Sequence, residues 1–332
     1  MGFGTQDAER KVLAILKVLT DSKEALGARV IARHLEDHGV ELGERAVRYH
    51  LKLMDERGLT RLVGLRDGRA LTELGIKEVR NALVKDKVGF AISRIELLAF
   101  RTDFNPKDRT GFIPINVSFF PKNKFNRAVQ TMKPVFANEL CVSHLVALAQ
   151  EGERLGDLIV PEGTVGFATV CSIVINGTLL KAGIPIDSRF GGLLQIRNSQ
   201  PFRFVELIHY DGSSLDPSEV FIKAGMTDVI GAAVRGEGSI LANFREIPAM
   251  CRPIVVHVIA NLKDAGIGGL LLMGSTSEPV CQIPVGLNRI GMILIGGLNP
   301  VAAAKEAGVD AENCAMSTLI EYTDLIKFEE LL

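Results

Sequence analysis

Apolar residues over the first part of the chain recur every three or four positions, which is the spacing of amphipathic helices. This pattern predicts helices over residues 7–19, 28–38 and 44–58. Residues 59–75 contain two short apolar runs on either side of an Asp-Gly turn and predict a β-hairpin. Three helices followed by a hairpin are the order of a winged helix-turn-helix, a DNA-binding fold.

The third predicted helix has two different faces. Val47, Leu51 and Met54 recur at helical spacing and are expected to pack inward. The opposite face carries basic and aromatic side chains suited to the major groove, where Arg binds guanine edges. Arginines on the hairpin are placed to contact phosphate or the minor groove. We therefore predict DNA contacts from Glu44, Arg45, Arg48, Tyr49 and Lys52 on the helix and from Arg61, Arg66 and Arg69 on the hairpin.

Beyond residue 86 the pattern changes to apolar runs typical of strands, with helices between them. An Asn176-Gly177 pair between two apolar runs predicts a second hairpin. The predicted strands are residues 90–104, 111–120, 164–175, 178–186, 192–197, 202–210, 268–273, 279–285 and 291–297. The predicted helices are residues 119–132, 137–150, 215–226, 254–265, 298–309 and 314–325.

Two motifs occur twice in this second region. An Ile-Pro pair followed by Arg-x-Gly begins at Ile184 and again at Ile283. An Asx-Pro pair opens two of the predicted helices, where Asp216 and Asn299 are expected to act as N-caps. The intervals between the copies differ, so the pattern predicts an irregular α+β domain with an internal duplication rather than a solenoid.

Composition narrows the class of protein. Hydrophobic residues make up 47% and charged residues 23%, as in folded soluble proteins. The apolar runs are too short for a membrane span and no signal peptide opens the chain, so we expect a cytoplasmic protein without a membrane partner. The five cysteines form no CxxC pair, which argues against disulfides and structural zinc. The sequence lacks the G-x-S-x-G, P-loop, H-E-x-x-H and G-x-G-x-x-G signatures, so we expect neither an enzyme nor a cofactor.

Several polar groups in the second region suit a small anion. Arg forks bind carboxylates through two hydrogen bonds, and exposed backbone N–H groups at glycines add donors. Two or three arginines near a Gly-rich turn favour a dicarboxylate. The candidate effector-binding residues are Cys171, Ser172, Asn176, Ser188, Arg189, Gly191, Gly192, Arg245 and Arg289.

The chain resembles the NrpR family of nitrogen-regulation transcriptional repressors. The resemblance lies in "ERAVRYHLKLMDERGL" and "GRALTELG" near the N-terminus, and in "INGTLLKAGIPIDSRFGG", "YDGSSLDPSEVFI", "ILANFREIPA" and "IPVGLNRIGMILIGGLNPVAAAKEAG" further on. It implies a repressor that binds palindromic operator DNA of nitrogen-assimilation genes and is released by 2-oxoglutarate. It also implies a winged helix-turn-helix followed by an NrpR-type sensor domain. Some members carry two sensor domains in one chain, whereas this chain carries one.

We therefore expect residues 1–86 to bind double-stranded operator DNA and residues 87–332 to bind the effector and dimerise. A single sensor domain implies a homodimer or a higher even oligomer, or pairing with a second NrpR-type protein. Two alternatives stay open at this point. The repressor can respond to another small carboxylate or an amino acid, or the second domain can be a carboxylate-metabolising enzyme fused to a DNA-binding domain.

Overall fold

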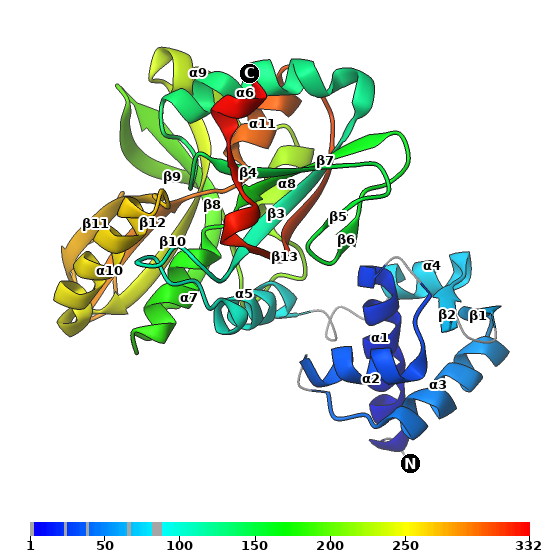
Figure 1. Cartoon of the computed structure of the whole chain (residues 1–332). Helices are drawn as coiled ribbons and strands as arrows, with labels where there is room; N and C mark the ends of the chain where they lie inside the picture. Colours follow the sequence, from blue (N-terminus) through cyan, green and yellow to red (C-terminus); the bar gives the residue numbers. More distant parts are fainter. Residues whose placement is uncertain (1–2, 23–24, 38–39, 65–67, 82–87) are drawn as a thin grey trace. The chain divides into compact units, whose positions relative to one another are not determined.

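The structure is a computed structural model and describes residues 3–22, 25–37, 40–64, 68–81 and 88–332. The chain divides into an N-terminal unit, Met1–Val88, and a C-terminal unit, Gly89–Leu332. The division lies close to the boundary expected at residue 86. The two units are described separately below (Figure 1).

The N-terminal unit is a winged helix. Its elements are α1 (Phe3–Ser22), α2 (Ala28–Asp37), α3 (Glu44–Glu56), β1 (Thr60–Gly64), β2 (Gly68–Leu71) and α4 (Glu73–Asn81). The inward residues predicted on the third helix, Val47, Leu51 and Met54, are fully buried in the core of this unit. The hairpin β1-β2 is antiparallel, and a bridge between Leu26 and Arg69 adds the segment before α2 to its edge.

The C-terminal unit is an α+β domain built on two five-stranded antiparallel sheets. Its first part comprises α5 (Phe90–Arg101), β3 (Phe112–Pro121), η2 (Lys122–Lys124), α6 (Phe125–Ala137), β4 (Leu145–Gln150), β5 (Arg154–Leu155), β6 (Leu158–Ile159), β7 (Thr164–Val170), α7 (Ile173–Lys181), β8 (Asp187–Arg197) and β9 (Gln200–His209). Its second part comprises α8 (Pro217–Lys223), α9 (Val229–Arg235), β10 (Gly238–Pro248), η3 (Ala249–Cys251), α10 (Arg252–Asp264), β11 (Leu270–Thr276), β12 (Arg289–Ile295), α11 (Asn299–Glu306), β13 (Glu312–Glu321), η4 (Tyr322–Asp324), β14 (Ile326–Lys327) and η5 (Phe328–Leu331).

The two sheets arise from a duplicated strand-helix-strand-strand-helix-strand unit. The first copy is β3, α6, β4, β7, α7 and β8, and the second is β10, α10, β11, β12, α11 and β13. The sheet orders, β11-β12-β10-β8-β9 and β13-β3-β7-β4-β14, are those of ferredoxin-like units. The fourth strand of each copy pairs with the first strand of the other, because β8 lies beside β10 and β13 beside β3. The copies are thus interlocked.

Helices cover the sheets on two sides. Figure 1 shows α6, α9 and α11 gathered on one side of the strands and α5, α7 and α10 on the other. The helices α6 and α11 come from different copies of the duplicated unit, as do α7 and α10, and each pair packs together. The exchange therefore includes the second helix of each copy as well as its last strand.

The duplication is present, but the repeated motifs that predicted it do not stand at equivalent positions. One Ile-Pro motif leads into β8, the fourth strand of the first copy, and the other leads into β12, the third strand of the second copy. Of the two Asx-Pro helices, α11 belongs to the repeated unit whereas α8 lies between the copies. The true correspondence places Pro121 with Pro248, each followed by a 3-10 turn and a helix of 13 residues.

Two predicted strand regions are helices. Residues 90–101 form α5 rather than a strand, and the hairpin predicted around Asn176-Gly177 is the helix α7. Gly177 is needed for packing instead of a turn, because a Cβ there would lie 2.4 Å from the Cβ of Thr102. Asn176 is buried and its amide donates to the Ser188 hydroxyl at 3.0 Å, so a turn-forming pair is stabilised within a helix by tertiary contacts.

Other predictions for single elements were also wrong. The helix expected over residues 137–150 is a connecting segment followed by the strand β4, and the one over residues 314–325 is largely β13. Both strands lie in a sheet covered on two faces, so their apolar residues do not alternate cleanly with polar ones. Residues 279–285 form a bridge between Val280 and Ile283 instead of a strand. The helix over residues 254–265 is confirmed as α10.

The two predicted N-caps behave differently. The Asp216 carboxylate accepts hydrogen bonds from the backbone N–H groups of Ser218 and Glu219, so its role at the start of α8 is confirmed. Asn299 is not the cap of α11. Its buried side chain instead accepts from the Leu241 N–H at 2.8 Å and donates to the Leu241 carbonyl at 3.1 Å, joining the helix to β10.

Glu219 makes the stability of the C-terminal unit depend on pH. Its Oε1 accepts a hydrogen bond from the Ala315 N–H at 2.5 Å, and burial, with Asp216 adding to it, raises the pKa of the Glu219 carboxyl to about 7. The folded chain thus binds this proton more tightly than the unfolded chain. The free energy of unfolding therefore falls as pH rises from about 4.5 to about 7, by on the order of 2 kcal/mol.

We expect Glu219→Gln to remove the fall in the free energy of unfolding at higher pH, because the amide keeps the acceptor oxygen and carries no charge. Thermal unfolding followed by circular dichroism at pH 5 and pH 8 tests it. The variant should unfold at a higher temperature than the natural chain at pH 8 and at a similar temperature at pH 5. An equal difference at both pH values would contradict the prediction.

Candidate DNA interface and candidate anion site

The outer face of α3 carries the side chains expected to read DNA. Tyr49 is 62% exposed, and Arg48 forms an ion pair with the half-buried Glu44 one turn earlier. The exposed members of the predicted set are Arg45, Arg48, Tyr49 and Lys52. Because one helix presents three cations and an aromatic ring on the same surface, it suits the major groove.

The hairpin arginines have different surroundings. Arg61 is exposed, whereas Arg69 is half-buried and its Nε lies 2.6 Å from Oδ2 of Asp55 on α3. Asp55 also accepts from the Thr60 hydroxyl at 2.6 Å, so it ties the hairpin to α3. Arg69 therefore holds the hairpin in place. Arg66 lies outside the described residues.

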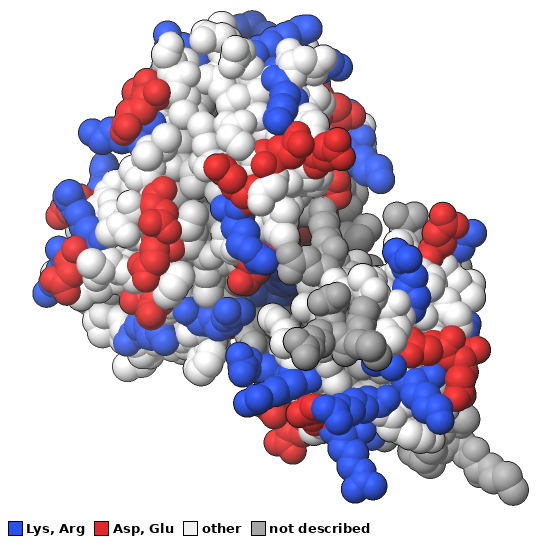
Figure 2. Space-filling view, turned by 45° about the vertical axis from the view of Figure 1, so that its right-hand side comes forward, with Lys and Arg blue, Asp and Glu red and all other residues white. Residues whose placement is uncertain are grey.

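The helix α2 carries positive charge that the sequence analysis did not include among the candidate DNA contacts. Arg29 and Arg33 stand one turn apart on α2, and both side chains are exposed. Their four-residue spacing was the signal that could have identified them. Figure 2 shows Lys and Arg side chains gathered along the lower edge of the N-terminal unit. Arg29 and Arg33 therefore add two exposed cations to the N-terminal unit.

The C-terminal unit encloses a polar cavity of about 20 Å³ where the two copies of the duplicated unit meet. Asn116 on β3 and Asn243 on β10 occupy equivalent positions, each five residues before the proline that ends its strand. The cavity is lined by Ile95, Asn116, Cys171, Ser172, Ile173, Tyr210, Asp216, Ser218, Asn243, Arg245, Gly297, Leu298, Ala315 and Met316. It therefore combines residues at the N-terminal ends of α7 and α11 with residues of the central strands β3 and β10.

Arg245 is the dominant charge at this cavity. Its side chain is 1% exposed, and its Nη2 donates to the Ser172 hydroxyl at 3.2 Å. Among the described residues, Nε and Nη1 have no hydrogen-bond partner and no carboxylate oxygen lies within 4.0 Å of the guanidinium. Burial lowers the pKa of Arg245, because the charged form loses its hydration. A buried cation with two unpaired donor nitrogens is suited to an anion.

The other polar groups of the cavity are hydrogen-bonded, and all but one are neutral. The exception is Asp216, whose Oδ1 accepts from the N–H groups of Ser218 and Glu219 and whose pKa is raised by burial. The Asn243 amide donates to Ser172 at 3.2 Å, and its carbonyl oxygen accepts from the Tyr210 hydroxyl. Burial raises the pKa of the Cys171 thiol to about 12 and moves the pKa of Tyr210 further above its usual range. Both groups therefore stay protonated at neutral pH. The site offers donors for an anion and no activated nucleophile.

The cavity is too small to hold a dicarboxylate in this arrangement of the chain. About 20 Å³ is room for roughly one water molecule, far less than a dicarboxylate needs. The N-terminal ends of α7 and α11 both border it, and helix N-termini favour anions through their free N–H groups. An anion can therefore bind to Arg245 only when part of the wall moves.

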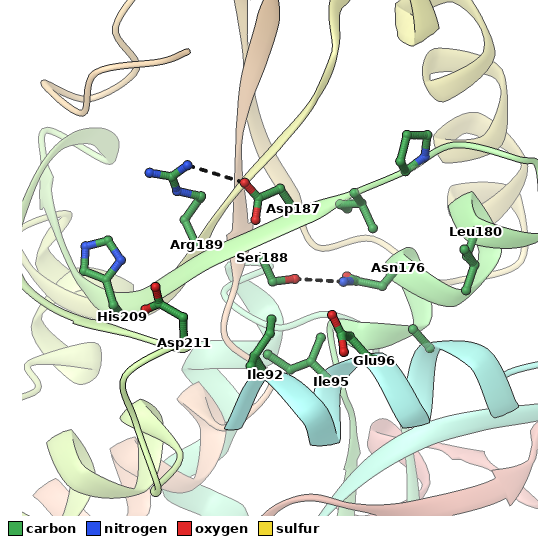
Figure 3. Close-up of a pocket in the computed structure, with 13 residues that line it drawn as sticks. Ile92, Ile95, Glu96, Asn176, Leu180, Asp187, Ser188, Arg189, His209 and Asp211 are labelled. Atoms are coloured by element: carbon green, nitrogen blue, oxygen red, sulfur yellow. Dashed lines mark hydrogen bonds and ion pairs between the residues drawn. The ribbon is translucent and has the colours of Figure 1, made fainter. Parts of the chain in front are cut away.

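Three of the predicted effector residues line a different, open groove. Asn176, Ser188 and Arg189 border a groove of about 610 Å³ between α5, α7 and β8 (Figure 3). Ser188 faces Asn176, whereas Asp187 and Arg189 lie on the opposite side of the strand and form an ion pair at 3.4 Å. The carboxylates of Glu96, Asp187 and Asp211 also border the groove. Their negative charge disfavours a dicarboxylate there.

The remaining predicted residues have structural partners. Arg289 Nε lies 3.0 Å from Oε2 of Glu246, and its Nη2 lies 3.8 Å from Oδ2 of Asp187, so its charge is already compensated. Gly191 and Gly192 are on β8, where a Cβ at either position would lie within 3.0 Å of neighbouring atoms. The structure therefore separates the predicted set: Cys171, Ser172 and Arg245 meet at the enclosed cavity, and the others do not.

The sequence argument missed Asn116, Tyr210, Asp216 and Asn243 as neighbours of the anion site. Asn243 had a signal, since it stands two residues before Arg245 and so on the same face of the strand. Asn116 and Tyr210 had none, because their places depend on how the two copies pair. Across the residues that the structure describes, we find no cluster of His, Cys, Asp and Glu suited to a metal ion. Within those ranges, no helix is both long and apolar enough to cross a membrane.

The two units define a winged-helix protein with a C-terminal regulatory domain. Residues 13–79 match the model of the ribonuclease R winged-helix domain, which agrees with the fold of the N-terminal unit. Residues 88–327 match the model "NrpR regulatory domains NRD1 and 2". The match covers most of the chain, and the chain belongs to the NrpR family.

Curated relatives carry the same family name. The chain is 39% identical to the global nitrogen regulator NrpRI of Methanosarcina mazei, over 95% of this chain and 96% of that protein. It is 33% identical to the global nitrogen regulator NrpR of Methanococcus maripaludis over 94% of this chain and 54% of that protein. It is also 33% identical to the global nitrogen regulator NrpR of Methanocaldococcus jannaschii, over 98% of this chain and 56% of that protein. The chain thus spans about half the length of these last two relatives.

A solved structure has the same fold as the C-terminal unit. The crystal structure of a nitrogen repressor-like protein from Methanococcus jannaschii superimposes with a TM-score of 0.61 at 25% identity. The superposition covers 73% of this chain and 99% of that protein. The relatives are regulators, which favours a regulatory rather than an enzymatic role for the C-terminal unit.

We expect Arg48→Ala to weaken binding of an operator duplex by about tenfold or more, because it removes an exposed cation from the centre of the α3 face. Fluorescence anisotropy with a labelled duplex at several salt concentrations measures the change. Lys77→Ala, which removes an exposed cation from α4, is the matched control and should have little effect. Equal losses in the two variants would contradict a recognition role for α3.

Proposed function

We propose that the chain is a nitrogen-responsive transcriptional repressor whose winged helix binds operator DNA and whose C-terminal unit binds 2-oxoglutarate as the releasing effector. The observation that carries the proposal is the buried, unpaired guanidinium of Arg245 in a protein of the NrpR family. The regulatory names of the relatives support the DNA-binding role of the basic α3 face. In this proposal the chain exists in two arrangements, one that binds the operator and one that does not, and the effector shifts the equilibrium toward the second.

A dicarboxylate suits the enclosed cavity better than the open groove. One carboxylate would accept hydrogen bonds from Arg245 Nε and Nη1, which have no partner among the described residues. The hydroxyl of Ser172, which accepts in both of its described hydrogen bonds, adds a donor near the N-terminal end of α7. In the groove, the same ligand would meet the carboxylates of Glu96 and Asp211, whereas the one carboxyl that lines the cavity, Asp216, already accepts from the N–H groups of Ser218 and Glu219. The proposed effector residues are therefore Arg245 and Ser172.

The helix α5 borders this cavity and is the first helix of the C-terminal unit. Ile95 on α5 is 2% exposed and borders both the enclosed cavity and the open groove, so it lies between them. Arg94 on the same helix donates from Nε to the Met316 carbonyl at 2.8 Å and from Nη2 to the Ser317 carbonyl. Because α5 is the first helix after the segment that joins the two units, its displacement by the effector would change how the DNA-binding units are held.

A second candidate effector is an amino acid bound in the open groove. The carboxylates of Glu96 and Asp211 have no ion-pair partner among the described residues, and they suit an ammonium group. The carbonyl oxygen of Asn176, also unpaired in the described part of the chain, would accept from such a donor. An amino acid in the groove would contact different residues from 2-oxoglutarate in the cavity. Variants at the two sites, Arg245→Met and Arg189→Ala, therefore distinguish the two effectors.

We expect Arg245→Met to lose 2-oxoglutarate binding by at least ~30-fold, because it removes the charged partner of a carboxylate. Isothermal titration calorimetry with 2-oxoglutarate measures this, with glutamate and citrate as comparison ligands. The variant should be as stable as the natural chain or more stable, because an apolar side chain of similar size replaces an unpaired buried charge. Arg189→Ala, which alters the groove, should bind 2-oxoglutarate normally.

The opposite result, with binding lost in Arg189→Ala and kept in Arg245→Met, would move the effector to the groove. Binding of glutamate in preference to 2-oxoglutarate would favour the amino-acid alternative. Failure of the natural chain to bind either ligand would reject both effectors and leave the DNA-binding role untouched. Turnover of 2-oxoglutarate by the purified chain would reject the regulatory role of the C-terminal unit.

We expect Arg94→Ala to tighten 2-oxoglutarate binding and to weaken operator binding without effector, each by roughly 2- to 10-fold, because it loosens α5 and favours the open state. Calorimetry and operator anisotropy on the same sample measure the two changes. Arg101→Ala at the exposed end of α5 is the control and should change neither. A change in one affinity without the other would show that α5 does not link the two sites.

A further inference from the structure

The open groove between α5, α7 and β8 has walls that are largely apolar. On α5, Ile92, Ile95 and Ala99 share the face that lines the groove, because they stand three and four residues apart. The other apolar residues of the lining are Leu180 on α7 and Pro185 and Ile186 just before β8. A volume of about 610 Å³ is typical of sites for small molecules. A ligand that fills this groove therefore needs an apolar body.

Two of the three carboxylates in the groove are free to bind a cation. Asp187 forms ion pairs with Arg189 at 3.4 Å and with Arg289 at 3.8 Å. Glu96 and Asp211, in contrast, have no ion-pair partner among the described residues. The lining thus has three carboxylates and, in the described part of the chain, one arginine. This excess of negative charge favours a positively charged ligand.

The two free carboxylates lie at different places along α5. Asp211 is beside the start of the helix, because a Cβ on its N-cap, Gly89, would lie 3.7 Å from the Asp211 carbonyl oxygen. Glu96 is seven residues further on, which corresponds to about 10 Å along a helix axis. Figure 3 shows Ile92 between Asp211 and Glu96. An apolar stretch of wall therefore separates two anionic groups.

A buried amide adds an acceptor at the Glu96 end of the groove. Asn176 is 2% exposed, and its Nδ2 donates to Ser188 whereas its Oδ1 has no partner among the described residues. Asn176 lines the groove, and the next residue, Gly177, packs against the Ala99 carbonyl in the second half of α5. A buried carbonyl oxygen without a donor costs free energy, which an N–H group of a ligand would recover. An ammonium at Glu96 would thus have two acceptors.

We infer that this groove binds a linear aliphatic diamine or polyamine. One ammonium group lies between Glu96 and the Oδ1 of Asn176, the other lies at Asp211, and the CH₂ groups between them pack on Ile92 and Ile95. Two positive charges match the two free carboxylates, whereas an amino acid would bring a further carboxylate into the groove. The inference goes beyond the proposed function, since this site is separate from the cavity at Arg245 and does not depend on the effector bound there.

Isothermal titration calorimetry of the full-length chain tests this inference, with hexamethylenediamine and spermidine as probes. The matched ligand is hexylamine, which has the same six-carbon chain as hexamethylenediamine but one ammonium group. We expect the diamine to bind about tenfold or more tightly than hexylamine, because its second ammonium meets a second carboxylate. Its affinity should fall with added salt, because Glu96 and Asp211 are exposed.

Variants then assign the binding to the two carboxylates. We expect Glu96→Gln and Asp211→Asn each to weaken the binding of hexamethylenediamine about fivefold or more, and the double variant to bind it no better than hexylamine. The matched control is Glu206→Gln, which removes an exposed carboxylate from β9 outside the groove and should bind the diamine normally. Arg245→Met should also bind it normally. Circular dichroism of each variant shows whether the fold is kept.

A natural chain that binds neither hexamethylenediamine nor spermidine, or binds the diamine no better than hexylamine, would overturn the inference. An equal loss in Glu206→Gln and Glu96→Gln would overturn it too, because the attraction would then not belong to the groove. Glutamate that displaces the diamine at similar affinity would assign the groove to an amino acid instead. A chain that binds the diamine but no 2-oxoglutarate would support the polyamine site and reject the proposed effector.

Discussion

A guanidinium that is 1% exposed, and whose Nε and Nη1 find no partner in the described part of the chain, costs free energy that the rest of the fold must offset. A hydrophobic side chain of similar size would avoid that cost. Around Arg245 the structure supplies a hydroxyl from Ser172 and the N-terminal ends of two helices, which carry partial positive charge, but no compensating carboxylate within 4.0 Å among the described residues. We propose that an anionic ligand compensates this charge, so that its binding shifts the equilibrium between two arrangements of the chain.

The duplication explains why this site lies between elements that can move. Because β8 and β13 exchange between the two copies, the cavity is formed by β3 and β10 together and by the N-terminal ends of α7 and α11. Neither copy forms it alone. The sheets are extensively paired, whereas α5 contributes the side chain of Ile95 to the lining of the cavity. We therefore expect α5 to be the part of the wall that moves when the cavity of about 20 Å³ enlarges.

The sequence predicted best where local physics decides the structure. The three helices and the hairpin of the N-terminal unit and the cap at Asp216 follow from periodicity and capping, and all are present. The predictions from the sequence failed where tertiary contacts decide the local structure. Asn176-Gly177 forms part of a helix because Gly177 packs against Thr102, and β4 and β13 are strands that resemble helices because both their faces are covered. Arg245 was predicted as an effector residue from its chemistry alone. That it lies at a different site from Arg189 and Arg289 could not be predicted, because this depends on how β10 pairs with its neighbouring strands.

Divergence between the two copies separates folding from function in this unit. Where β10 has Arg245, the equivalent position of β3 has Ser118, whose hydroxyl donates to Asn313 at 2.8 Å. Where α10 has Ile254, α6 has Arg127, which donates to the Ala307 carbonyl at 2.7 Å. In each pair the residue of the first copy binds the second copy, because Asn313 is on β13 and Ala307 follows α11. In the second copy, Nε and Nη1 of Arg245 have no partner among the described residues, and we propose that an anion supplies one.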